Sequence, residues 1–84
     1  MQKRRRRSKM EILDAILLSS CERTRQSKIV HRANLNSNLF KKYFAELSRD
    51  GFMERDGDQF RTTEKGREFL LDHVQAVREV KVFA

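Results

Sequence analysis

The sequence predicts a mainly α-helical α+β domain, in which three helices and a β-hairpin are followed by one more helix. Residues 27–51 indicate two helices joined by the turn Asn34-Leu35-Asn36, because apolar residues recur at helical spacing on both sides of it. Asp56-Gly57-Asp58 lies between two short segments and is a strong hairpin signal. Helical spacing resumes at Thr63, and the helix is predicted over residues 63–82.

The first helix is predicted from Lys9 to Ser20. Ser8 and Glu11 form the S-x-x-E pattern of a capping box, and apolar residues follow at helical spacing. Residues 1–7 carry a run of cations with no apolar anchor, so we expect a disordered basic arm there and a single folded domain over residues 8–84. This helix has a structural role, because it closes the core behind the two helices of residues 27–51.

A polar connection leads to the second helix. Thr24 and Arg25 fit a very short strand, and Ser27 is the expected cap of a helix that ends at Ala33. Ile29 in this helix is expected to face the core, together with Val30 and Ala33.

The third helix, residues 36–49 with Asn36 as its cap, is apolar on one side and basic on the other. A step of about 100° per residue groups Leu39, Phe40, Tyr43, Phe44 and Leu47 on one arc, which predicts the core face. The opposite arc contains no acid, and a surface of this kind is suited to a polyanion. Its members are Asn38, Lys41, Lys42, Ala45 and Arg49.

The hairpin is expected to turn at Asp56-Gly57, which places Met53 opposite Phe60. In the helix of residues 63–82, Thr63 is the expected cap, and Gly66 indicates tight packing of the first turn. The apolar stripe of this helix is longer than the rest of a small domain can bury, so we expect it to pair with the same helix of a second copy of the chain. The predicted dimer residues are Leu70, His73, Val74, Val77 and Val80.

Charge placement points to nucleic acid. The 84 residues carry a formal net charge of +7, and residues 1–9 hold six cations without an acid, so the remainder has a net charge of only +1. Within that remainder, Arg23 to Ala45 contains six cations and no Asp or Glu. Excess positive charge confined to a tail and to one helical segment is the electrostatic footprint of a nucleic-acid binder.

The composition also excludes several classes. One cysteine, Cys21, cannot form an intramolecular disulfide, and no apolar run is long enough to span a membrane, so we expect a cytoplasmic, nucleoid-associated protein. His31 and His73 have no nucleophile at motif spacing, and there is no cysteine pair, acidic metal cluster or phosphate-binding glycine loop. We therefore expect no enzyme, no cofactor and no metal or small-molecule ligand.

The residues also resemble a known group. Arg32-Ala33-Asn34-Leu35, Lys42-Tyr43 and T-x-K-G-x-E-F-L at residues 63–70 are similar to the pattern of archaeal winged-helix regulators and of the ten-kilodalton archaeal chromatin-associated winged-helix proteins. The resemblance implies a winged helix-turn-helix fold and a homodimer, formed through the last helices, that binds double-stranded DNA. The acidic hairpin tip departs from this pattern, because a DNA-touching wing is expected to be neutral or basic.

Two function classes follow: a double-stranded DNA-binding protein, either a transcriptional regulator or an architectural chromatin protein, and a winged-helix module for protein–protein interaction. For the first, the helix of residues 36–49 is expected in the major groove, and the arm and the wing are expected on phosphates. The predicted DNA-binding residues are Arg4, Arg5, Arg6, Arg7, Arg25, Lys28, Asn36, Ser37, Asn38, Lys41, Lys42, Arg49, Arg55 and Arg61.

Overall fold

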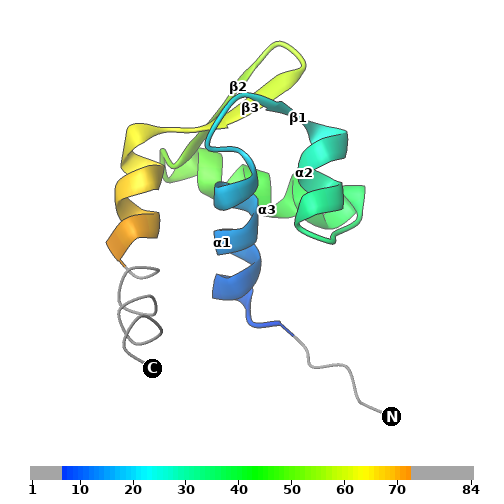
Figure 1. Ribbon diagram of the computed structural model, residues 1–84, viewed down its shortest axis with the longest axis horizontal. Helices are drawn as coiled ribbons and strands as arrows, with labels where there is room; N and C mark the ends of the chain where they lie inside the picture. Colours follow the sequence, from blue (N-terminus) through cyan, green and yellow to red (C-terminus); the bar gives the residue numbers. More distant parts are fainter. Residues whose placement is uncertain (1–6, 73–84) are drawn as a thin grey trace.

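The computed structural model of the 84-residue chain describes residues 7–72. Its elements follow the chain in the order α1 (Lys9–Ser19), β1 (Thr24–Arg25), α2 (Gln26–Arg32), α3 (Ser37–Arg49), β2 (Met53–Asp56) and β3 (Gln59–Thr62). Residues 64–72 form a further helix, here called helix 64–72. The predicted order of elements is thereby confirmed. The sheet lies across one end of the helices, α2 and helix 64–72 flank α1 on opposite sides, and α3 passes behind α1 (Figure 1).

Both ends of α1 are fixed by local hydrogen bonds. The Ser8 hydroxyl accepts from the Glu11 amide at 3.1 Å, and the Glu11 carboxylate accepts from the Ser8 amide at 2.9 Å, which confirms the predicted capping box. Ser20 is the C-cap, so the helix ends one residue earlier than expected. The prediction that Thr24 and Arg25 form a short strand is confirmed.

The predicted cap of α2 is wrong. The helix begins at Gln26, Ser27 lies inside it, and Arg25 at the cap position provides no side-chain hydrogen bond. The reason is that Thr24 and Arg25 pair with Phe60 and Gln59 of β3, so the chain passes directly from a strand into the helix.

The sheet has the antiparallel order β1-β3-β2, and its register corrects the predicted hairpin. Met53 pairs with Thr62 and Asp56 pairs with Gln59, so the turn is Gly57-Asp58 and not Asp56-Gly57. Gly57 has a φ of +66°, as required at the first central position of a type II′ turn. The expected pairing of Met53 with Phe60 is therefore shifted by two residues, although both side chains are buried.

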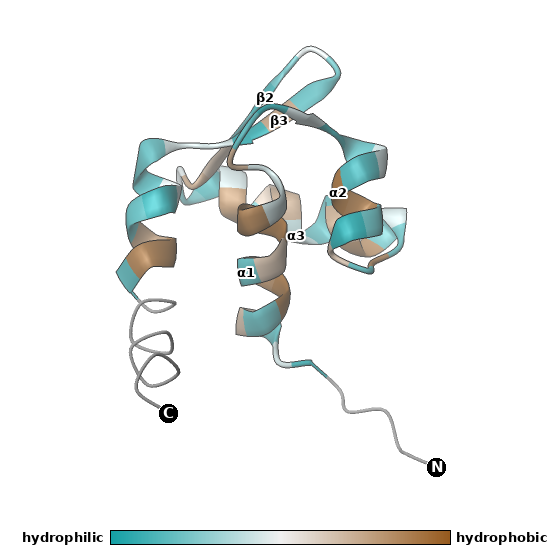
Figure 2. Ribbon diagram, in the orientation of Figure 1, coloured by the Kyte–Doolittle hydropathy of each residue, from teal (hydrophilic) through white to brown (hydrophobic). Residues whose placement is uncertain are grey.

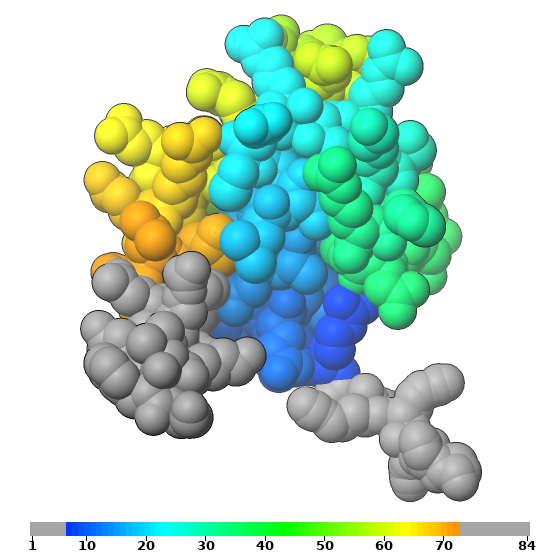
Figure 3. Space-filling view, in the orientation of Figure 1, coloured from blue at the N-terminus to red at the C-terminus, as the bar shows by residue number. Residues whose placement is uncertain are grey.

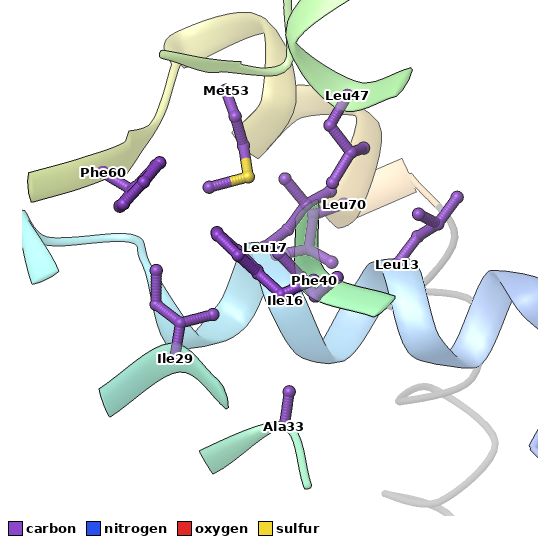
Figure 4. Packing of buried hydrophobic residues seen from close by; sticks show 10 residues of the cluster. All are labelled: Leu13, Ile16, Leu17, Ile29, Ala33, Phe40, Leu47, Met53, Phe60 and Leu70. Carbon is purple, nitrogen blue, oxygen red and sulfur yellow. The ribbon is translucent and has the colours of Figure 1, made fainter. Parts of the chain in front are cut away.

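The core is shared by all the helices and by the hairpin. Figure 4 shows side chains from α1, α2 and α3 meeting those of the two wing strands and of helix 64–72. The ribbon coloured by hydropathy shows the same division, with apolar residues on the inner sides of the helices and a hydrophilic wing tip (Figure 2). The buried apolar residues are Leu13, Ile16, Leu17, Ile29, Ala33, Phe40, Leu47, Met53, Phe60 and Leu70.

Helix 64–72 packs closely against the end of the loop that follows α3. A Cβ atom on Gly66 would lie 2.2 Å from the Phe52 carbonyl oxygen, which confirms that this turn needs glycine. Phe52 and Phe69 stack with their ring centroids 4.6 Å apart. The Thr63 hydroxyl accepts from the Gly66 amide at 3.0 Å, as expected of a cap. The predicted extension of this helix to residue 82 lies outside the described residues.

None of the helices in residues 7–72 has the length and apolar character needed to cross a membrane.

Candidate nucleic-acid interface

The interface begins with the turn between α2 and α3. Asn34 has a φ of +57°, a conformation that asparagine tolerates better than most residues, and the Leu35 amide donates to the Val30 carbonyl at 2.9 Å. The Asn36 side-chain oxygen accepts from the Leu39 amide at 2.8 Å and so caps α3, as predicted. The turn therefore fixes the angle at which α3 leaves α2.

Arg7 binds this same turn. Its guanidinium donates to the Ala33 carbonyl at 2.7 Å and to the Asn34 carbonyl at 2.8 Å. A cation at these carbonyls also complements the negative end of the α2 dipole. The last residue of the predicted basic arm is thus attached to the domain, whereas Arg4, Arg5 and Arg6 lie outside the described residues.

The apolar side of α3 holds the helix against β3. Phe60 of β3 meets Phe40 edge-to-face, with ring centroids 5.2 Å apart, and meets Phe44 in the same way at 5.0 Å. Phe40 and Leu47 are buried, while Leu39, Tyr43 and Phe44 are half-buried. This confirms the predicted core face and ties α3 to the wing through one aromatic cluster.

The opposite side of α3 is solvent-exposed, as predicted, at Asn38, Lys41, Lys42, Ala45 and Arg49. We call these five residues the basic face. Across residues 7–72, no carboxylate forms an ion pair with a cation of the basic face. The Lys42 ammonium lies 5.4 Å from the centre of the Tyr43 ring, which leaves its charge available. The basic face can therefore approach a polyanion without first breaking an ion pair.

Glu46, the sole acid of α3, is neutralised from another helix. Its carboxylate lies 2.9 Å from the Lys9 ammonium of α1. The hydrogen bond from Lys9 lowers the pKa of Glu46, and the same contact raises the pKa of Lys9. The pair connects the start of α1 to α3 and partly balances this negative charge.

The two predicted wing arginines have partners within the wing. The Arg55 Nε donates to the Gly57 carbonyl at 2.8 Å, and its guanidinium lies 5.6 Å from the centre of the Phe60 ring. Arg61 forms an ion pair with Glu54, its neighbour across the hairpin. Both arginines are thus positioned by local contacts before any ligand arrives.

The remaining predicted DNA-binding residues within residues 7–72 lie in two places outside the basic face. Asn36 and Ser37 are exposed at the start of α3, whereas Arg25 and Lys28 line a groove of about 730 Å³ between the end of α1, β1 and α2. Arg23 and Arg32, which are not among the predicted site residues, also line this groove. Their place in the acid-free segment from Arg23 to Ala45 was the signal that pointed to them.

The predicted dimer residues are only partly covered by the structure. Leu70 is buried in the core of its own chain, with 5% of its surface exposed. His73, Val74, Val77 and Val80 lie outside the described residues. Within residues 7–72 no three His, Cys, Asp or Glu side chains form a group that could hold a metal ion.

Comparisons with known proteins agree with this geometry. The winged helix-turn-helix family matches residues 6–82. Among solved structures, the chain is similar to Sso10a-2, a DNA-binding protein from Sulfolobus solfataricus, with a TM-score of 0.71 and 24% sequence identity over 89% of this chain and 82% of that one. A comparison with curated proteins finds no match. The chain, with its helix-turn-helix, three-stranded sheet and hairpin wing, therefore belongs to the winged helix-turn-helix family.

Proposed function

We propose that this protein binds double-stranded DNA, with α3 in the major groove, and that it acts as a transcriptional regulator. The observation that carries the proposal is the basic face of α3, which is exposed, free of acids and backed by a rigid aromatic cluster. A helix of this kind fits the major groove of B-DNA. The similar protein Sso10a-2 is described as DNA-binding, which supports the proposal.

The residues of the basic face divide by chemistry. Asn38 is the candidate for reading bases, because an asparagine amide can form two hydrogen bonds with the edge of adenine. We assign Lys41, Lys42 and Arg49 to the phosphates, because contacts with phosphates fix the position of the helix and not the sequence that it reads. Ala45 is small enough to let the helix backbone come close to the groove floor.

Charge reversal on the basic face tests DNA binding. Lys41→Glu combined with Lys42→Glu should abolish measurable binding to a 20-base-pair duplex, with folding unchanged by circular dichroism. The single variant Lys42→Glu should weaken binding at least about tenfold, since phosphate contacts dominate affinity. Lys65→Glu on helix 64–72 makes the same change in charge outside the basic face and serves as the matched control. If Lys42→Glu and Lys65→Glu bind equally well, α3 does not enter the groove.

A salt series separates a regulator from an architectural protein. Binding to one random and one upstream-region duplex should fall with salt, with a log–log slope of about −0.9 for each phosphate contacted. A regulator should prefer the upstream duplex and keep that preference at higher salt. Asn38→Ala should then reduce the preference while changing the salt slope little. Equal affinity for both duplexes would instead indicate an architectural protein.

A further inference from the structure

Each carboxylate near the wing tip is paired with an arginine that comes before α2. Arg23 lies 3.3 Å from the Asp56 carboxylate, and Arg25 lies 3.7 Å from that of Asp58. In Figure 3 the cyan segment before α2 reaches up on both sides of the yellow-green wing tip. The acidic tip, which departs from the expected pattern of a DNA-binding wing, therefore has a specific counterpart in the same chain.

Strand pairing, and not the attraction of the charges, places these groups together. Gln59 of β3 pairs with Arg25 on one side and with Asp56 on the other. The ends of β1 and β2 are thus held at the same level of the sheet. The arginines remain close to the wing whether or not the carboxylates are present.

Both arginines also line the groove between α1, β1 and α2, together with Lys28 and Arg32. The lining of this groove contains these four cations and one acid, Glu22. Guanidinium groups bind carboxylate and phosphate with the same two-pronged geometry. Arg23 and Arg25 therefore have two possible kinds of partner, the wing carboxylates and the phosphates of a duplex.

The present pairs are easy to break. The side chains of Arg23 and Asp56 are 57% and 60% exposed, and those of Arg25 and Asp58 are 68% and 76% exposed. Exposed ion pairs of this kind contribute little free energy because water screens them. A row of DNA phosphates has a higher charge density than two separate carboxylates and can displace them.

We propose that Asp56 and Asp58 act as intramolecular substitutes for DNA phosphates, which occupy Arg23 and Arg25 in the free protein and lower its affinity for the duplex. This inference rests on the proposed DNA-binding function and adds Arg23 and two carboxylates to it. The wing tip then regulates affinity by competition, and only a ligand with phosphates spaced to reach both arginines replaces it fully.

Removing the carboxylate charges tests the proposal. Asp56→Asn combined with Asp58→Asn keeps the size and the turn preference of both residues, so the hairpin is retained. This wing variant should bind a 20-base-pair duplex about three- to tenfold more tightly than wild type at low salt, since exposed ion pairs are weak and their loss has a modest effect. The difference should shrink as salt rises and screens the charges.

Two further variants provide the controls. Glu68→Gln with Asp72→Asn removes two acids from helix 64–72 and makes the same change in net charge away from β1. Arg23→Gln with Arg25→Gln should weaken binding, and in that background the wing substitutions should have no effect beyond that of the Glu68 and Asp72 control. Thermal melting of each variant verifies that the domain is folded.

The outcomes distinguish this proposal from the proposed function. If wild type binds DNA and the wing variant binds no more tightly than the Glu68 and Asp72 control, the competition is refuted while DNA binding stands. A gain larger than that of the control, if it persists without Arg23 and Arg25, refutes the competition as well. If no form of the protein binds the duplex, the proposed function fails and this inference fails with it.

Discussion

At the scale of single residues, two buried hydroxyl groups join the end of α1 to the sheet. Ser20 and Thr62 are almost completely buried, and their side-chain oxygens lie 3.0 Å apart. The Thr62 hydroxyl also lies 2.8 Å from the Leu17 carbonyl, and its amide donates to the Ser20 carbonyl at 2.7 Å. These contacts satisfy the polar groups that the last turn of α1 exposes to the core.

Thr62→Val should therefore destabilise the fold by about 1–3 kcal/mol, because it removes the buried hydroxyl that contacts the Leu17 carbonyl and the Ser20 hydroxyl while the side chain keeps its shape. Urea denaturation monitored by circular dichroism measures the change. Ser48→Ala on the exposed side of α3 is the control and should remain within about 0.5 kcal/mol of wild type. A Thr62→Val protein as stable as the control would show that the hydroxyl pair contributes nothing.

At the scale of elements, Asn36 and Ser27 were both predicted to cap a helix, but only Asn36 does so. Asn36→Ala should cost about 1 kcal/mol, since it removes the side-chain bond to the Leu39 amide. Ser27→Ala should change stability by less than about 0.5 kcal/mol, because Ser27 lies inside α2 and caps nothing. Thermal denaturation of both variants gives the comparison. Equal losses would mean that Ser27 does act as a cap.

The ion pair between α1 and α3 predicts how stability depends on pH. Because Lys9 lowers the pKa of Glu46, the pair stabilises the fold above the ordinary carboxyl value of 4.5 and loses this effect as the pH falls through the lowered pKa. Because the pKa of Lys9 is raised, the effect is present in full below 10.5 and is lost as the pH rises through the raised pKa. Thermal melting of Glu46→Gln should show a small loss at pH 7 that shrinks as the pH falls below 4.5. Glu68→Gln, the control, should not show this pH dependence.

Short-range sequence patterns, such as helix caps and apolar spacing, predicted most helices and strands correctly. The wrong predictions concern the hairpin register and the cap of α2, which depend on pairing between strands that are far apart in the sequence. The caps at Ser8 and Asn36 depend on residues three positions away, so the sequence contains them completely. The hairpin register cannot be read from the local sequence in this way, since Asp56-Gly57-Asp58 offers two different two-residue turns. A shift of two residues keeps Met53 and Phe60 on the same side of the hairpin, so the apolar pattern fits both registers. Pairing of β3 with β1 adds a constraint that only the folded chain supplies.

In the candidate site, too, some features could be predicted from the sequence and others depend on the folded chain. The basic face follows from helical periodicity alone, and the structure exposes every residue predicted for it. The pairs of Arg23 with Asp56 and of Arg25 with Asp58 depend on the register and on the fold of the wing over β1. No spacing in the sequence encodes them. The attachment of Arg7 to the turn after α2 is equally non-local.

At the scale of the whole molecule, we predict a homodimer through the helix that begins near Thr63. Val77→Asp should reduce the mass measured by light scattering from two chains to one, because a charge in an apolar helix pair is costly. Glu68→Asp is the conservative control on the same helix. If Val77→Asp leaves the mass unchanged, the predicted helix pair is not the interface. In a dimer, the two DNA half-sites should lie about one helical turn, or a multiple of it, apart.

The division of α3 into a packed side and an exposed side has a consequence for evolution. The aromatic cluster of Phe40, Phe44 and Phe60 fixes where the helix sits, and none of the five exposed positions contributes to it. Mutations at those five positions therefore escape the selection that maintains folding. Under the proposed function, lineages that inherit this scaffold can change the surface that faces DNA one residue at a time, and each intermediate remains a folded protein.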